Sequence, residues 1–161
     1  MSKIIGISGW KNVGKTFYSS LIIKLLVERG YKVGSIKHAH HSFDIDKPGT
    51  DSFKHRDAGS CQVIISSSRR WAKITENKDQ NEKSLEELIE EFNDVDIVVV
   101  EGFKKESHPK IEILSKDFKN KNKEIKNVIA FVSDELNDTS TPVFKKNEIE
   151  NLVEFIIKKI L

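Results

Sequence analysis

The sequence predicts an α/β fold in which a mostly parallel, twisted sheet is flanked by helices and carries an antiparallel extension. The first observation is the stretch Gly9–Thr16, which reads Gly-Trp-Lys-Asn-Val-Gly-Lys-Thr. The second is its context, because an apolar run precedes this stretch and an amphipathic run follows it. The third is that apolar runs of strand length alternate with helical segments along the rest of the chain. Together they predict that residues 1–161 form a single phosphate-loop NTPase domain, which binds a nucleotide.

The predicted loop has the chemistry of a triphosphate cradle. Backbone N–H groups and the positive end of the following helix attract an anion, and Gly14 lets the backbone approach it. Lys15 would reach the β- and γ-phosphates, while the hydroxyl of Thr16 would complete the shell of a Mg²⁺ ion. The alternative is a glycine turn in an ordinary strand–helix unit, which the strand and helix around the motif disfavour. The residues expected to contact the nucleotide are Gly9, Trp10, Lys11, Asn12, Val13, Gly14, Lys15, Thr16 and Phe17.

Periodicity and turn signals place the elements that follow the loop. A helix is expected to end at Gly30, with an apolar face formed by Phe17, Leu21, Ile22, Leu25 and Leu26. Residues 31–36 alternate apolar and polar side chains and predict a strand. Pro48 and Gly49 predict a turn, after which Thr50 is expected to cap a short helix that runs to Asp57.

A hairpin is predicted in the middle of the chain. The apolar run Cys61–Ser67 is expected to form one strand, with residues 69–75 as its antiparallel partner. Cys61 is the only cysteine, so an intrachain disulfide is excluded and a reducing compartment is favoured. Its apolar neighbours predict a small buried core residue rather than a nucleophile.

The second half of the chain alternates strands and helices again. Ser84 and Glu87 form a capping box before a helix with the apolar face Leu85, Leu88, Ile89 and Phe92. Strands are expected over residues 96–100, 111–115 and 128–132. The polar segments 77–83 and 116–126 are expected to be loops, and a final amphipathic helix that begins at Asn147 is expected to pack on the sheet.

Glu101 is the expected acidic partner of the loop. It ends the apolar strand 96–100, and ligands of parallel sheets bind at the carboxyl ends of the strands. A Mg²⁺ ion held by Thr16 needs such an acidic group on a second strand. Asp96 begins the same run and is therefore expected at the opposite end of the sheet. The alternative is that Glu101 is a strand-end charge without a ligand.

Four of the five histidines lie within a short span, at His38, His40, His41 and His55. One interpretation is a polar loop that is rich in histidine. Another is a loop beside the γ-phosphate, with Asp44, Asp46 or Asp51 as weaker candidates for the Mg²⁺ site. A transition-metal site is a third interpretation, although no paired cysteine or helical HExxH pattern supports it.

A second anion site is the further hypothesis for this region. Arginine is scarce in the chain, and its planar guanidinium is well suited to binding phosphate. The residues that would bind a second phosphorylated ligand are Lys37, His38, His40, His41, Arg56, Arg69 and Arg70. The alternative is that each basic side chain is a separate surface charge.

Composition excludes several classes of function. The chain has 27 Lys and Arg against 25 Asp and Glu, a net charge of +2, which does not favour nucleic-acid binding. No apolar run is long enough to span a membrane, and the N-terminus does not read as a signal peptide. A cytoplasmic protein is therefore expected.

Several ordered motifs resemble one known family. They are Gly34-x-Ile-Lys-His-x-His-His-x-Phe-Asp-Ile-Asp-x-Pro-Gly49, Asp51-Ser-x-x-His-Arg-x-Ala-Gly59, Ser67-Ser-x-Arg-Trp71, Val100-Glu-Gly-Phe-Lys104 and Pro109-Lys-Ile-Glu112. With the loop, they are similar to the molybdopterin-guanine dinucleotide biosynthesis protein B family over nearly the whole chain.

This resemblance implies a GTP-binding protein with GTP and Mg²⁺ as cofactors. Members of the family are usually homodimers and are thought to assist protein A of the pathway, the guanylyltransferase that joins GMP to molybdopterin. The nucleotide loop maps onto Gly9–Thr16, and the second acidic motif maps onto Glu101 and Gly102. The chain departs from other GTP-binding proteins in lacking an Asn-Lys-x-Asp signature for guanine. It also has Trp10 where relatives that dimerise across a nucleotide carry a lysine.

Three functions are consistent with these residues. The first is an accessory GTP-binding protein of molybdenum cofactor biosynthesis, which would be a weak GTPase at most. No arginine finger or water-positioning glutamine is evident, and no catalytic residue is assigned. The second is a small-molecule kinase. Kinases of this fold close an arginine-bearing lid over the phosphates, so the lack of any arginine after Arg70 disfavours this function. The third is a metal-delivery GTPase that uses the histidines.

Overall fold

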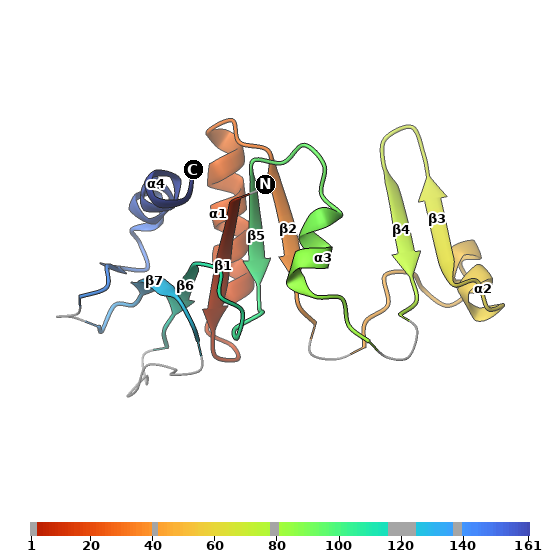
Figure 1. Ribbon diagram of the computed structural model, residues 1–161, viewed down its shortest axis with the longest axis horizontal. Coiled ribbons are helices and arrows are strands. Elements are labelled where there is room, and N and C mark those ends of the chain that lie inside the picture. The colour runs from red at the N-terminus through yellow and green to blue at the C-terminus, as the bar shows by residue number, and fades with distance from the viewer. Residues whose placement is uncertain (1–2, 40–41, 78–80, 116–124, 137–139) are drawn as a thin grey trace. The chain divides into compact units, whose positions relative to one another are not determined.

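The computed structural model describes residues 3–39, 42–77, 81–115, 125–136 and 140–161. The chain gathers into two compact units, one formed by residues 1–38 with 84–161 and the other by residues 39–83 (Figure 1). A single domain over the whole chain stays a prediction.

The first unit is built on a six-stranded sheet with the order β2-β5-β1-β6-β7-β8, in which every pairing is parallel. The strands are β1 (Lys3–Gly9), β2 (Val33–Lys37), β5 (Ile97–Glu101), β6 (Lys110–Ile113), β7 (Val128–Val132) and β8 (Val143–Phe144). The predicted strands are confirmed within a residue or two at their ends. The two-residue strand β8 was not predicted.

Helices cover both faces of this sheet. On one face, α1 (Lys15–Glu28) and α4 (Ile149–Ile160) pack on a buried cluster that includes Ile97 and Val99 of β5. On the other face, α3 (Leu85–Glu90) packs with Val98 and Val100 of the same strand. Alternate residues of β5 are thus buried on opposite faces, which explains its continuous apolar sequence.

Capping explains where two of the helices begin. The predicted box at Ser84 and Glu87 is confirmed, because each side chain accepts a hydrogen bond from the other residue's backbone N–H. The last helix begins at Ile149, two residues later than expected. There Glu148 is the N-cap residue, and its carboxylate accepts from the Lys145 N–H at 2.7 Å rather than capping the helix.

The second unit holds α2 (Asp51–Asp57), β3 (Gln62–Ser66) and β4 (Trp71–Thr75). The predicted Thr50 cap is confirmed by its hydroxyl accepting from the Phe53 N–H, and the two strands form the predicted antiparallel hairpin. The expectation of a buried Cys61 is wrong, because this residue is exposed. Val63 is the only buried residue of β3, since a two-stranded ribbon has little depth in which to enclose a side chain.

Within the described ranges, no helix has the length and apolar character needed to cross a membrane.

Candidate functional site

The backbone between β1 and α1 forms a loop that opens toward the start of the helix. Gly9 can have no side chain, because a Cβ there would lie 2.6 Å from the carbonyl oxygen of Ile113. Gly14 is the N-cap residue of α1 in a left-handed conformation, with φ of 91°. No side chain caps this helix and no acidic residue lies in its first turn. The first N–H groups and the positive end of α1 are therefore not bound by a capping side chain or by an acidic residue of the first turn, and they suit a bound anion.

Thr16 and Glu101 meet at the mouth of this loop. The Thr16 hydroxyl donates to Glu101 Oε1 at 2.9 Å, across 85 residues of sequence. The sheet brings them together because β5 lies beside β1, with Glu101 opposite Ile7. The Glu101 side chain is only 13 % exposed. A hydroxyl and a carboxylate oxygen are ligands that suit Mg²⁺, so the pair fits the metal that a phosphate loop requires.

Lys15 lies in an environment that favours a bound anion. Its ammonium donates to the Trp10 carbonyl at 2.8 Å. Burial and the positive charges of Lys104 and Lys37 lower the pKa of Lys15, and the negative charge of Glu101 opposes them in part. The ammonium groups of Lys37 and Lys104 thus repel that of Lys15 at the loop, and a bound polyphosphate would relieve this repulsion.

Lys104 is a residue of this environment that sequence reasoning did not single out. Its ammonium lies 5.7 Å from the centre of the Trp10 ring. The signal was present in the sequence, because Lys104 follows Glu101 by three residues and the turn at Gly102 keeps it near the same strand end. Lys37 was predicted to bind an anion, and the structure places it beside Thr16 and Glu101.

The histidine segment is only partly described. The His38 ring stacks on Phe103 with 4.6 Å between ring centres, so it lies in the first unit beside the end of β5. His40 and His41 lie outside the described residues. Within the ranges that the structure covers, no group of three or more His, Cys, Asp or Glu side chains is arranged to hold a metal.

Arg56 is surrounded by carboxylates in the second unit. Its guanidinium donates to Asp46 at 2.7 and 3.1 Å, to Asp44 at 2.9 Å and to Glu76 at 2.9 Å. The Asp46 side chain is only 3 % exposed, and hydrogen bonding to Arg56 lowers its pKa. To bind a second phosphate, Arg56 would therefore have to give up its contact with Asp46. To bind Mg²⁺, Asp46 would have to give up its contact with Arg56.

The other candidates of that unit are distributed over its surface. Asp51 begins α2 and pairs with Lys54 at 3.2 Å. Arg69 and Arg70 lie exposed in the turn between β3 and β4, where their N–H groups donate to the Ser67 hydroxyl. Arg56 bonds instead to Glu76 at the open end of the hairpin. The three arginines are thus at opposite ends of the ribbon.

A buried polar cluster around Lys110, at the start of β6, was not predicted. The Lys110 ammonium is fully buried and donates to the carbonyls of Glu106, His108 and Lys126. Burial lowers the pKa of Lys110 to about 8 and that of His108 to about 4. The alternation Lys-Ile-Glu-Ile over β6 predicts a polar face, but both faces of this strand are buried. Nothing in that alternation shows that its polar face would be covered.

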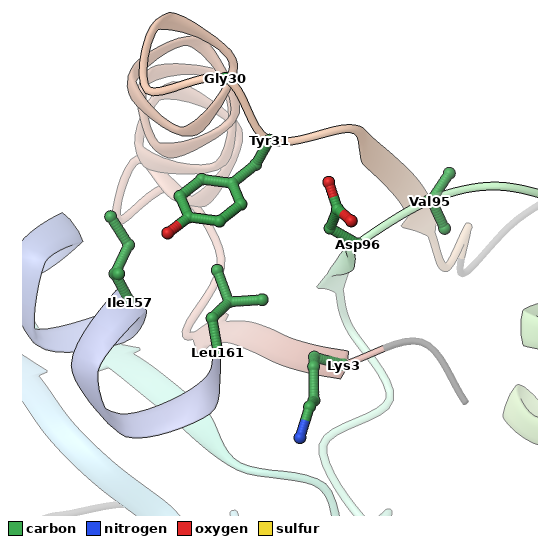
Figure 2. A pocket seen from close by; sticks show the side chains of 7 residues that line it. All are labelled: Lys3, Gly30, Tyr31, Val95, Asp96, Ile157 and Leu161. Atoms are coloured by element: carbon green, nitrogen blue, oxygen red, sulfur yellow. The ribbon is translucent and has the colours of Figure 1, made fainter.

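A depression lies at the other end of the sheet and is separate from the loop. Figure 2 shows Tyr31, Ile157 and Leu161 around it, with Lys3 and Asp96 at the amino-terminal ends of β1 and β5. Asp96 accepts from the Lys32 N–H at 2.8 Å. The expectation that Asp96 lies away from Thr16 and Glu101 is therefore confirmed.

Comparison with known proteins identifies relatives over nearly the full length. A relative from Escherichia coli (strain K12), called molybdopterin-guanine dinucleotide biosynthesis adapter protein, is 34% identical over 163 residues, 98% of this chain and 93% of its own. One of the same description from Haemophilus influenzae is 42% identical over 110 residues, 67% of this chain and 61% of its own.

Solved structures agree with this similarity. A crystal structure of molybdopterin-guanine biosynthesis protein B has a TM-score of 0.76 at 27% identity and covers 96% of this chain and 97% of its own. Bacillus subtilis MobB, with a TM-score of 0.77 at 24% identity and 99% and 98% coverage, shares the fold. The sequence model of molybdopterin guanine dinucleotide synthesis protein B matches residues 4–134, and this chain belongs to that family.

Proposed function

We propose that this chain is a GTP-binding adapter of molybdopterin guanine dinucleotide biosynthesis, which binds Mg²⁺–GTP in the loop between β1 and α1. The observation that carries the proposal is the meeting of Thr16 and Glu101 at 2.9 Å beside Lys15. The adapter role is supported by the names of the relatives from Escherichia coli and Haemophilus influenzae.

The proposed site divides its work among three side chains. Lys15 releases the Trp10 carbonyl and binds the β- and γ-phosphates, which are stronger acceptors for an ammonium than a neutral carbonyl. Thr16 and Glu101 contribute oxygens toward Mg²⁺, directly or through its water shell. The N–H groups at the start of α1 bind phosphate oxygens.

Hydrolysis is proposed to be weak in the isolated chain. The unit that holds the loop contains one arginine and no glutamine in its sequence. That arginine, Arg29, is bound to Glu150 and Glu154 at 2.5 and 2.8 Å. Without a group that stabilises the transferring phosphoryl, the rate falls by roughly 10³–10⁵. GTP binding is thus proposed as the function, with turnover dependent on a partner.

The proposed partner is the guanylyltransferase of the pathway, and the proposed form of this chain is a homodimer in the cytoplasm. Light scattering after size exclusion measures the dimer directly. Co-purification of the purified guanylyltransferase with this chain, in the presence and absence of Mg²⁺–GTP, measures the partnership. A monomer, or no complex under either condition, would contradict the respective part of the proposal.

Calorimetric titration with GTP and with ATP in the presence of Mg²⁺ tests the binding function. The expected result is a clear preference for GTP, and removal of Mg²⁺ with EDTA should weaken its binding. Equal binding of both nucleotides would retain the phosphate loop but contradict the guanine assignment. Absence of binding by either nucleotide would contradict the loop assignment itself.

A further inference from the structure

The ammonium group of Lys37 lies against both of the side chains that would hold the metal. Lys37 Nζ is 3.3 Å from the Thr16 hydroxyl oxygen and 3.4 Å from Glu101 Oε1. These two oxygens are themselves 2.9 Å apart. A positive charge of the protein therefore contacts both of the oxygens that Mg²⁺ requires in the proposed function.

The sheet holds the backbone of Lys37 in this place. Lys37 ends β2 and lies directly opposite Glu101 in the parallel register of β2 and β5. The next residue extends the pairing, because the His38 N–H donates to the Glu101 carbonyl at 2.8 Å. The side chain of Lys37 is nonetheless 62 % exposed, so its ammonium can leave the contact for solvent without any change in the sheet.

We propose that Lys37 is a built-in counter-cation that occupies the metal position of the loop and yields it only to a metal that arrives with a triphosphate. The proposal rests on the proposed binding of Mg²⁺–nucleotide and adds to it the reason why metal and nucleotide enter together. It makes Lys37 a positioning residue for metal entry.

Electrostatics explains the coupling between the two ligands. An ammonium and a divalent ion a few ångströms apart repel each other, so Mg²⁺ can take the Thr16 and Glu101 oxygens only if Lys37 moves away. In the nucleotide-free protein the displaced ammonium gains only water. When a triphosphate is present, the displaced ammonium gains an anion with several charge-assisted acceptors. Binding of the metal alone is thus disfavoured, whereas binding of the metal together with its nucleotide is not.

Mn²⁺ binding to the nucleotide-free protein tests the proposal, because this ion shares the oxygen preference of Mg²⁺ and is read directly by electron paramagnetic resonance. The Lys37→Met variant keeps the length of the side chain and removes its charge. Its affinity for Mn²⁺ alone should rise by about tenfold or more, since the competing cation is gone. Its affinity for Mg²⁺–GTP should fall, since the triphosphate loses a partner. A residue with a merely structural role would not move the two affinities in opposite directions.

Two further variants complete the test. Lys37→Arg keeps the charge and should keep Mn²⁺ binding as weak as in the parent chain. Lys104→Met removes a neighbouring charge that no described contact joins to Thr16 or Glu101, and should raise Mn²⁺ affinity much less than Lys37→Met.

The outcomes separate this inference from the proposed function. Equal Mn²⁺ affinity of the parent chain and Lys37→Met, including undetectable binding by both, overturns it. So does a rise with Lys104→Met as large as that with Lys37→Met. Failure of the parent chain to bind Mg²⁺–GTP would overturn the proposed function and is read from the nucleotide titration, whereas the Mn²⁺ measurement needs no nucleotide.

Discussion

Lys15 is the residue on which nucleotide binding depends most directly. Its ammonium is aimed at the loop, where it donates to the Trp10 carbonyl at 2.8 Å. Replacing Lys15 by Ala should lower the affinity for Mg²⁺–GTP by roughly 10- to 100-fold, the range for a hydrogen bond to a charged group. Isothermal titration measures the affinity, and the thermal unfolding midpoint should change little.

Lys24→Ala is the matched control for that variant. Lys24 lies on the same helix, is exposed and pairs only weakly with Glu28 at 3.7 Å. Its replacement should leave nucleotide affinity unchanged. An unchanged affinity in Lys15→Ala would refute the loop assignment.

His108 makes the stability of the protein sensitive to acid. It is buried, its two ring nitrogens have no hydrogen-bond partner among the described residues, and burial with the nearby Lys110 charge lowers its pKa to about 4. Between pH 6.5 and 4 the unfolded chain therefore binds a proton at His108 that the folded chain does not. Stability should fall as the pH falls through this window, by up to about 3 kcal/mol from this residue.

The His108→Leu variant isolates this contribution. Urea unfolding at several pH values between 4 and 7 gives the free energy of unfolding for each chain. The parent chain should lose more stability toward pH 4 than the variant, whatever their difference at pH 7. Parallel pH dependences would show that His108 is not the cause.

Sequence reasoning succeeded at residue level where a fold rule links two positions, and failed where burial depends on the whole molecule. Thr16 and Glu101 were paired in advance because strand-end residues of a parallel sheet converge at one edge. Cys61 was expected in the core because its neighbours are apolar, but a two-stranded ribbon encloses little. The carboxylate partners of Arg56 are dispersed from Asp44 to Glu76, and no local pattern joins them.

At the scale of elements, the close approach of β2 to the turn after β5 depends on a glycine. Gly102 has φ of 110°, and a Cβ there would lie 2.6 Å from His38 Cβ. Gly102→Ala should therefore destabilise the protein by about 3 kcal/mol, from backbone strain and from the overlap. Chemical denaturation measures the loss.

Gly30→Ala separates those two causes. Gly30 follows Arg29, the C-cap residue of α1, with φ of 89°, and a Cβ there would have no atom within 4 Å. This variant should lower the free energy of unfolding by about 1 kcal/mol, from backbone strain alone. Equal losses in Gly30→Ala and Gly102→Ala would contradict the claim that His38 packs tightly on Gly102.

Elements were predicted well where the sequence carries its own boundary signal. The capping box at Ser84 and the cap at Thr50 placed the starts of α3 and α2 to the residue, although Phe92, expected on the apolar face of α3, lies beyond its end at Glu90. The start of α4 was misplaced because Asn147 resembles a cap residue, whereas the helix begins after Glu148. Strand β8 has only two residues, so no periodicity could reveal it.

At the scale of the molecule, the second unit depends on the ion cluster around Arg56. This cluster joins the segment before α2, the helix itself and the end of the hairpin through Asp44, Asp46 and Glu76. In Arg56→Met, amide hydrogen exchange within residues 39–83 should accelerate by about tenfold or more, while the first unit keeps its protection.

Arg69→Met supplies the comparison for that substitution. Arg69 lies exposed in the hairpin turn of the same unit, so its loss should leave the exchange rates there nearly unchanged. Equal acceleration in both variants would show that the ion cluster does not hold the unit together.

The position of β1 within the sheet has a consequence for biosynthesis. β1 lies between β5 and β6, so Lys3 pairs with Ile97 and Gly9 pairs with Ile113. A ribosome that adds about 5–20 residues per second finishes β1 several seconds before either neighbour exists. The segment that forms α2 and the β3–β4 hairpin, whose strands pair with each other, is synthesised in that interval. The nascent chain therefore carries the strand that leads into its nucleotide loop unpaired until the segment that contains Glu101 has emerged.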